Sequence, residues 1–195
     1  MKDGFLSVRA ASPALRVANC DYNTEQILLQ MQAAASDGVK LLCLPELCLT
    51  GYTCSDLFLQ AELLRGAEHG LERILLASRE LDLVVLVGLP LAMDGKLYNC
   101  AAVVARGKLL GLVPKTWLPN YSEFYELRHF VSGPSQVREV RFAGQDTLFG
   151  SRLLFACRQM ESFVLGVELC EDLWAPVPPS CNHALAGATV VANLS

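Results

Sequence analysis

Short apolar runs of strand length recur along this chain, and residues typical of turns bound most of them. The expected strands are residues 5–11, 41–44, 83–89, 96–105, 108–113, 152–156, 163–168 and the end of 185–192. Residues 23–38 and 55–81 instead carry apolar side chains at helical spacing. Strands interleaved with helices in this order indicate a mixed α/β layered fold, in which helices cover a sheet.

Turn and cap residues set the expected element boundaries. Asn23, with a glutamine three residues later, is typical of a helix N-cap, and Gly38 suits the exit of that helix. The second helical segment contains Gly66 and Gly70 and is expected to break near one of them. Asp94-Gly95 predicts a hairpin turn between two strands.

Composition excludes several functional classes. With 52% hydrophobic and 18% charged residues among 195, the chain can bury a large core. A net charge of -4, with no basic patch interleaved with aromatic residues, argues against nucleic acid or an anionic membrane as partner. The longest apolar run, residues 83–93, is about half of what a bilayer crossing needs, and no signal peptide is recognisable. We therefore expect a cytoplasmic protein.

The eight cysteines do not form a recognisable disulfide or zinc pattern. There is no CxxC pair, and Cys43 and Cys157 lie inside apolar runs, where a free thiol behaves as a small hydrophobic group. The spacing of Cys43, Cys48 and Cys54 fits no zinc motif, so no metal site is expected.

Reactive side chains follow three of the expected strands, namely Glu46, Lys115 and Cys170. Each alone is compatible with an ordinary structural or surface role. A thiol has a pKa of about 8.5, and the carboxyl groups next to Cys170 in the sequence would raise it further. A cation and a base must therefore come from elsewhere if Cys170 is to attack a substrate, and Lys115 and Glu46 can supply them. A helix that begins after Cys170 would add backbone N–H donors.

Three longer motifs surround these residues. They are CLPELCLTGYTCSDLF at 43–58, PKTWLPNYSEFYE at 114–126 and GVELCEDLW at 166–174. Together they resemble the three signatures of the nitrilase (carbon-nitrogen hydrolase) superfamily, in the form found in glutamine-dependent NAD synthetases, and the similarity runs from about Phe5 to the last residue. The resemblance implies a nitrilase-type four-layer αββα sandwich. It also implies that residues 1–195 are a glutaminase domain, incomplete at its C-terminus, with the synthetase domain absent.

The resemblance assigns a role to each reactive residue. Glu46 matches the general base, Lys115 the lysine that stabilises the tetrahedral intermediate, and Cys170 the nucleophile.

The same resemblance implies five substrate-binding positions. Tyr121 matches a tyrosine that contacts glutamine, and Glu123, eight positions after the lysine, matches a second glutamate that supports the lysine and the substrate amide. Phe124 and Tyr52 match aromatic residues that line the pocket, and the backbone N–H of Glu171 would be a further oxyanion donor. An alternative stays open, in which Tyr121, Phe124 and Tyr125 only anchor a loop by burying their rings.

The implied reaction is hydrolysis of glutamine to glutamate and ammonia, for ATP-dependent amidation of nicotinic acid adenine dinucleotide to NAD. No SGGxDS-like loop occurs here, so the synthetase domain, with its ATP and Mg, is expected elsewhere, as are the family's later serine and arginine contacts to glutamine. No cofactor is expected in this domain, and a homo-oligomer is expected.

Alternatives stay open. They are a stand-alone nitrilase-type amidase acting on another small amide, and a non-catalytic fragment that serves as an interaction module. Papain-like chemistry through His183 is disfavoured, because no matching signature surrounds that histidine.

Overall fold

The computed structural model describes residues 5–195. The elements of the first half are β1 (Val8–Ala10), α1 (Cys20–Ser36), β2 (Leu41–Cys43), η1 (Ser55–Leu59), α2 (Ala61–Ala77), β3 (Val84–Met93) and β4 (Lys96–Ala105). Those of the second half are β5 (Lys108–Pro114), η2 (Glu126–Arg128), β6 (Arg138–Phe142), β7 (Gln145–Phe149), β8 (Leu154–Cys157), β9 (Met160–Leu169), η3 (Cys170–Trp174), α3 (Pro179–Leu185) and β10 (Val190–Leu194).

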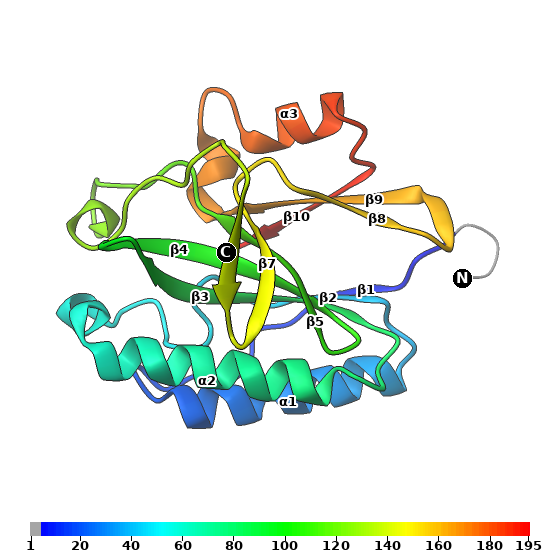
Figure 1. The fold of residues 1–195 in the computed structure, drawn as a ribbon, viewed down its shortest axis with the longest axis horizontal. Helices are drawn as coiled ribbons and strands as arrows, with labels where there is room; N and C mark the ends of the chain where they lie inside the picture. Colours follow the sequence, from blue (N-terminus) through cyan, green and yellow to red (C-terminus); the bar gives the residue numbers. More distant parts are fainter. Residues whose placement is uncertain (1–4) are drawn as a thin grey trace.

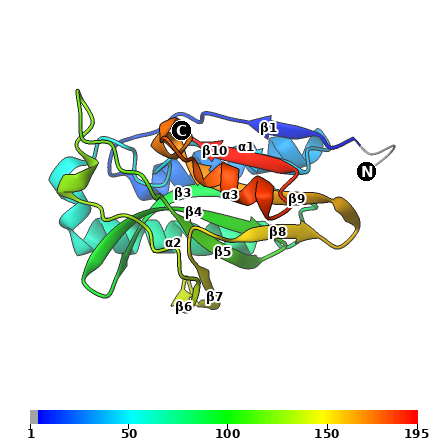
Figure 2. The same cartoon turned by 90° about the horizontal axis from the view of Figure 1, so that it is seen from above.

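The strands form two sheets. A seven-stranded sheet has the order β1-β2-β3-β4-β5-β7-β6, and a three-stranded sheet has the order β10-β9-β8. Helices α1 and α2 lie along one face of the larger sheet, the smaller sheet lies on the opposite side, and α3 packs beyond β9 (Figures 1 and 2). The predicted mixed α/β layered fold, with helices covering a sheet, is confirmed.

The central strands are buried on both faces, which explains why they are nearly continuous apolar runs in the sequence. Along β4, Ala102 and Val104 join the core beneath α1 and α2. The alternate residues Ala101 and Val103 pack instead in a second core, shared with residues of β9 such as Leu165. Because successive side chains point to opposite faces of a strand, one strand serves both cores.

The first helix begins earlier than the sequence pattern predicted. Its N-cap is Asn19, whose side chain accepts a hydrogen bond from the backbone N–H three residues further on at 3.0 Å. Asn23 lies inside the helix, fully buried, where its amide donates to the carbonyl oxygens of Arg16 and Leu49 at 2.9 and 3.1 Å. The prediction of Asn23 as the cap was wrong, because this side chain holds a neighbouring loop instead. The exit at Gly38, with φ +74°, is confirmed.

The second helix is not broken at either glycine. The 3-10 turn η1 ends before Gln60, and α2 then runs without a break through Gly66 and Gly70. A Cβ at Gly70 would lie 2.5 Å from the hydroxyl of Thr24, and one at Gly66 would lie 3.2 Å from the sulfur of Cys20. These glycines allow α1 and α2 to approach closely, so they mark a packing contact rather than a helix end.

Tight turns join the antiparallel strands. Asp94 and Gly95 have φ of 52° and 70° and connect β3 to β4, as predicted. The hairpin β6–β7, joined through Ala143 and Gly144, was not predicted, because its charged sequence lacks a buried apolar run.

No helix within residues 5–195 is both long enough and apolar enough to cross a membrane. All eight cysteines are free thiols.

Candidate active site

The three reactive residues predicted from the sequence stand just beyond strand ends. Glu46 lies in the loop after β2, Lys115 directly follows β5, and Cys170 directly follows β9. β2 and β5 belong to the larger sheet, whereas β9 belongs to the smaller one. The site therefore forms where two sheets meet, and its parts come from distant segments of the chain.

The loop that carries Glu46 runs across β3 at Gly88. Backbone hydrogen bonds join Leu44 N to Leu86 O at 3.1 Å and Leu49 N to Gly88 O at 3.2 Å. A Cβ at Gly88 would clash with the carbonyl oxygen of Pro45 and with the peptide that follows Glu46. The absence of a side chain at this position lets the loop lie flat on the strand and point Glu46 into the interior.

A buried ammonium group bridges two buried carboxylates at the centre of the site. Nζ of Lys115 lies 2.6 Å from Oε1 of Glu46 and 2.6 Å from Oε1 of Glu126. The exposed fractions of the three residues are 1%, 6% and 5%. Two of the three N–H bonds of the lysine point at these carboxylates, so one is left for a further acceptor.

The two carboxylates differ in how they are held. Oε1 of Glu46 accepts from both Lys115 and the amide of Asn99, at 2.6 and 2.7 Å, and its Oε2 accepts no hydrogen bond from residues 5–195. Both oxygens of Glu126 are used, since Oε1 accepts from Lys115 and from the hydroxyl of Tyr52, and Oε2 faces the same Asn99 amide at 3.4 Å. Glu46 thus keeps one oxygen for a proton, whereas Glu126 is saturated.

Burial and charge shift the pKa values of this group. Burial raises the pKa of Glu46, the charge on Lys115 opposes that shift, and the charge on Glu126 adds to it. Burial alone would lower the pKa of Lys115, but the two carboxylates outweigh it and raise the pKa. The lysine therefore stays protonated, and the excess negative charge makes Glu46 a better proton acceptor than an exposed glutamate.

Cys170 begins the 3-10 turn η3 in a left-handed backbone conformation, with φ +40°. This conformation is costly for a residue with a side chain and is found preferentially at functional sites. Burial raises the pKa of its thiol, and Glu46 and Glu126 add to that effect while Lys115 opposes it. The cysteine thus lies within electrostatic range of the buried lysine and both carboxylates.

The side chain of Asp172 connects turn η3 to the segment that follows Lys115. Its Oδ1 accepts from the backbone N–H groups of Thr116 and Trp117 at 3.0 and 2.7 Å, and its Oδ2 accepts from that of Leu169 at 3.1 Å. Burial raises its pKa to about 6, although these hydrogen bonds oppose the shift. One carboxylate therefore joins the residues just after Lys115 to the residue just before Cys170.

An aromatic chain borders the site. Tyr52 and Phe124 meet edge to face with ring centroids 6.4 Å apart, and Phe124 and Tyr121 do so at 5.7 Å. The hydroxyl of Tyr121 donates to the carboxylate of Glu171 at 2.8 Å. The predicted pocket residues Tyr52, Tyr121, Phe124 and Glu171 are thus connected, and Tyr121 is 53% exposed at the outer end of the chain.

Glu123 is not the carboxylate that contacts the lysine. The glutamate on Lys115 is Glu126, whereas Glu123 is exposed and lines a cavity of about 200 Å³ that Tyr52 and Glu126 also line. The resemblance led us to expect the second glutamate eight residues after Lys115, but the glutamate that contacts the lysine follows it by eleven residues. The reason is that the loop after β5 turns Glu126 inward and leaves Glu123 exposed.

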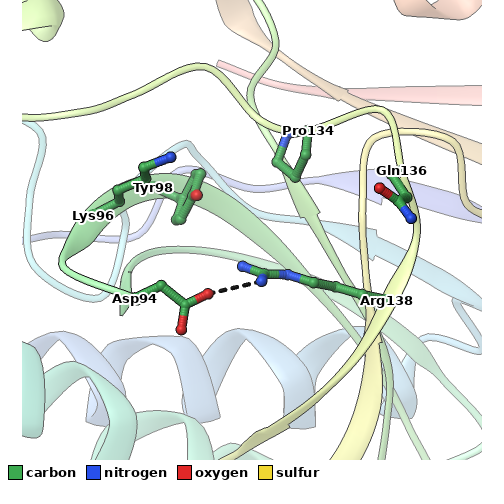
Figure 3. A pocket seen from close by; sticks show the side chains of 6 residues that line it. All are labelled: Asp94, Lys96, Tyr98, Pro134, Gln136 and Arg138. Carbon is green, nitrogen blue, oxygen red and sulfur yellow. Dashed lines mark hydrogen bonds and ion pairs between the residues drawn. The ribbon is translucent and has the colours of Figure 1, made fainter.

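A second cavity of about 280 Å³ lies near the β3–β4 turn and away from these residues (Figure 3). Its lining residues are Asp94, Lys96, Tyr98, Pro134, Gln136 and Arg138. Arg138 is neutralised there by Asp94 at 2.7 Å, and none of the candidate catalytic residues reaches it.

Among residues 5–195, no group of three or more His, Cys, Asp or Glu side chains is placed to hold a metal ion. The side chains gathered at the site are a buried ammonium group, two buried carboxylates and a half-buried thiol.

The family model for carbon-nitrogen hydrolases matches residues 6–195. This chain belongs to the carbon-nitrogen hydrolase family. A glutamine-dependent NAD(+) synthetase from Mycobacterium tuberculosis is 43% identical over 192 residues, which cover 98% of this chain and 28% of that protein. A glutamine-dependent NAD(+) synthetase from Aquifex aeolicus is 32% identical over 192 residues, which cover 98% of this chain and 30% of that protein. This carbon-nitrogen hydrolase domain therefore spans under a third of the length of these curated relatives.

Solved structures share the fold of this carbon-nitrogen hydrolase domain. A crystal structure of a glutamine-dependent NAD(+) synthetase from Cytophaga hutchinsonii has a TM-score of 0.85 at 30% identity, over 97% of this chain and 30% of that chain. An amidase from Nesterenkonia sp. has a TM-score of 0.75 at 19% identity, over 100% of this chain and 66% of that chain. The mixed α/β fold is that of nitrilase-like proteins.

Sequence reasoning missed Asn99 and Glu126. Asn99 is the one uncharged polar side chain between Tyr98 and Val104 in an otherwise apolar strand, and a buried amide needs hydrogen-bonding partners. That signal could have marked it. Glu126 carried no comparable signal, because only the folded loop shows which of its two glutamates turns inward.

Proposed function

We propose that this domain hydrolyses the side-chain amide of glutamine to glutamate and ammonia, with Cys170 as nucleophile, Glu46 as general base and Lys115 as oxyanion donor. The observation that carries the proposal is the bonding of Glu46, because its Oε1 is held by two donors while its Oε2 is open to take a proton. Support for glutamine comes from the name of the 43% identical relative, a glutamine-dependent NAD(+) synthetase.

The first half of the reaction forms a thioester. Glu46 takes the proton of the Cys170 thiol as the sulfur attacks the amide carbon, and the carbonyl oxygen becomes an oxyanion. The remaining N–H of Lys115 and the backbone N–H of Glu171 stabilise that oxyanion, and one such donor is typically worth about 3 kcal/mol. Glu46 then gives its proton to the amide nitrogen, the C–N bond breaks, and ammonia leaves.

The second half regenerates the thiol. Glu46 takes a proton from water as the water oxygen attacks the thioester carbon, and the second oxyanion is held by the same donors. The C–S bond then breaks, the sulfur recovers a proton from Glu46, and glutamate is released. Tyr121, Phe124, Tyr52 and Glu123 border the space in which this substrate would lie.

We propose further that the ammonia serves an ATP- and Mg-dependent synthetase domain outside this chain, which amidates nicotinic acid adenine dinucleotide to NAD. The basis is the name shared by the relatives and their greater length. A complete four-layer αββα sandwich and a homo-oligomeric assembly belong to the same proposal.

The test is ammonia release from glutamine by the purified protein. We expect Cys170→Ala and Glu46→Gln to abolish it, and Cys181→Ala, which alters an exposed thiol, to leave it unchanged. Hydroxylamine should trap the thioester as γ-glutamyl hydroxamate. Hydrolysis of acetamide or propionamide with no release from glutamine would reject glutamine as the substrate and favour a general amidase.

A further inference from the structure

Asn99 occupies a position at which its amide acts on both carboxylates of the site. It lies on β4 and is fully buried. Its backbone carbonyl accepts from the backbone N–H of Lys115 at 2.8 Å, while its side-chain Nδ2 donates to Glu46 and faces Glu126. A single residue therefore touches the backbone of the lysine and the side chains of both glutamates.

The orientation of this amide follows from the charges around it. Two carboxylate oxygens lie 2.7 and 3.4 Å from Nδ2, and a carbonyl oxygen in that place would face them without a proton between. The amide must therefore present its N–H groups to the glutamates. Its Oδ1 is left buried without a hydrogen-bond partner among residues 5–195.

An unpaired buried carbonyl destabilises a fold, so the amide at this position needs an explanation other than packing. A leucine has the same branched arrangement of side-chain heavy atoms and carries no buried acceptor that could be left unpaired. What the leucine lacks is the N–H donor to Oε1 of Glu46.

We propose that Asn99 is a positioning residue that holds Oε1 of Glu46 and so turns Oε2 toward the Cys170 thiol as the proton acceptor. The inference rests on the proposed function for the identity of the base. Lys115 alone cannot fix the carboxylate, because its ammonium is shared with Glu126 and can rotate about either contact. The second donor on the same oxygen removes that freedom.

The ionisation of Glu46 depends on every charged or titratable group that faces it. These are Lys115 beyond β5, Glu126 in η2, Tyr52 in the loop after β2, and Cys170 in η3. Burial raises the pKa of Glu46, and the hydrogen bond from Asn99 is one of the contacts that oppose this shift. Loss of the amide should therefore move the ionisation of Glu46 to higher pH.

The experiment compares Asn99→Ala and the isosteric Asn99→Asp with a control, Val104→Ala. Val104 is fully buried on the same strand, in the core beneath the helices, so its truncation tests lost packing alone. For Asn99→Ala we expect kcat for glutamine to fall by about 10- to 100-fold, part of the contribution of a general base, with KM nearly unchanged. The acid limb of the kcat/KM profile should move to higher pH in Asn99→Ala. It should move further in Asn99→Asp, because this change adds a third carboxylate to the site.

A second readout does not require glutamine. The rate of Cys170 alkylation by iodoacetamide is measured against pH, and peptide mass spectrometry separates this thiol from the other cysteines. We expect the profile to move to higher pH in both Asn99 variants and not in Val104→Ala. Profiles that coincide with that of the parent in all variants would overturn the positioning role. A shifted profile in a protein that does not hydrolyse glutamine would reject the proposed substrate and keep the role of Asn99.

Discussion

The ammonium group of Lys115 lies 2.6 Å from the carboxylate of Glu126, eleven residues further along the chain, and this carboxylate also accepts a hydrogen bond from the hydroxyl of Tyr52. Glu126 is 5% exposed, whereas Glu123, three residues before it, is exposed to solvent. Two glutamates of one loop are thus in different electrostatic environments, and this separates their expected roles.

Glu126→Gln should lower glutamine hydrolysis far more than Glu123→Gln. The first change removes the negative charge that holds Lys115, and loss of oxyanion stabilisation costs about 10²- to 10³-fold in kcat. The second changes a side chain that does not contact the lysine, so an effect within about tenfold, mainly on KM, is expected. Steady-state kinetics of both variants measure this difference in kcat. An equal loss of kcat in the two variants would mean that Glu123 also acts on the lysine during turnover.

Lys115→Met should destabilise the protein strongly at neutral pH. It leaves Glu46 and Glu126 buried without their shared cation, and removing one partner of a buried ion pair costs about 3–5 kcal/mol. Urea unfolding at pH 7 measures the loss. The matched control is Lys40→Met, because the Lys40–Asp82 pair at 2.7 Å is largely exposed and such pairs contribute about 0–1 kcal/mol.

The loss in Lys115→Met should become smaller as the pH falls. A carboxyl group whose pKa is higher in the folded state than in the unfolded state binds its proton more tightly when folded, so acid stabilises that fold relative to neutral pH. The same urea titrations at pH 5 test this sign. A deficit that grows on acidification would contradict the assignment of two stranded carboxylates.

The activity of the parent protein should fail on the acid side at a pH above the ordinary pKa of a glutamate. Burial raises the pKa of Glu46 from 4.5, and as the proposed base Glu46 must be ionised to take the thiol proton. The pH profile of kcat/KM reports this ionisation in the free protein. An acid limb at or below pH 4.5 would mean that another group serves as base.

Gly88→Ala should reduce activity through the loop that carries Glu46. The added methyl group would clash with the backbone around Pro45 and Glu46, so the loop must move and take the carboxylate with it. We expect a fall in kcat of at least about tenfold, since small displacements of catalytic groups are costly. Gly66→Ala is the control, because its methyl group would meet only the side chain of Cys20 between the helices. Activity within twofold of the parent in Gly88→Ala would show that the loop tolerates the shift.

The sequence pattern predicted those parts of the fold that are buried on both faces. The strands β3, β4 and β5 and the turn at Asp94-Gly95 were recognisable because continuous apolar runs and a turn dipeptide mark them. The hairpin β6–β7 was missed, since its short strands are rich in polar and charged residues and contain no continuous apolar run. The helix break expected at Gly66 or Gly70 was wrong, because propensity cannot show that a second helix packs on these glycines.

The candidate site could be predicted only in part, for a similar reason. Glu46, Lys115 and Cys170 follow strand ends, and the motifs around them are long enough to identify. The partners that contact Glu46 and Lys115 are Asn99, inside strand β4, and Glu126, at the start of the short 3-10 turn η2. Their roles depend on which side chain turns inward, and sequence spacing does not contain that information.

The Cys170 thiol follows a strand of the three-stranded sheet, while Glu46 and Lys115 follow strands of the seven-stranded one. In the proposed mechanism, the distance between the Cys170 thiol and the Glu46 carboxylate is consequently a property of how the two sheets stack, and not of any single loop. Substitutions in the apolar layer between the two sheets, at Val113 or Leu165 for example, should therefore change the rate of glutamine hydrolysis without altering any of the proposed catalytic groups.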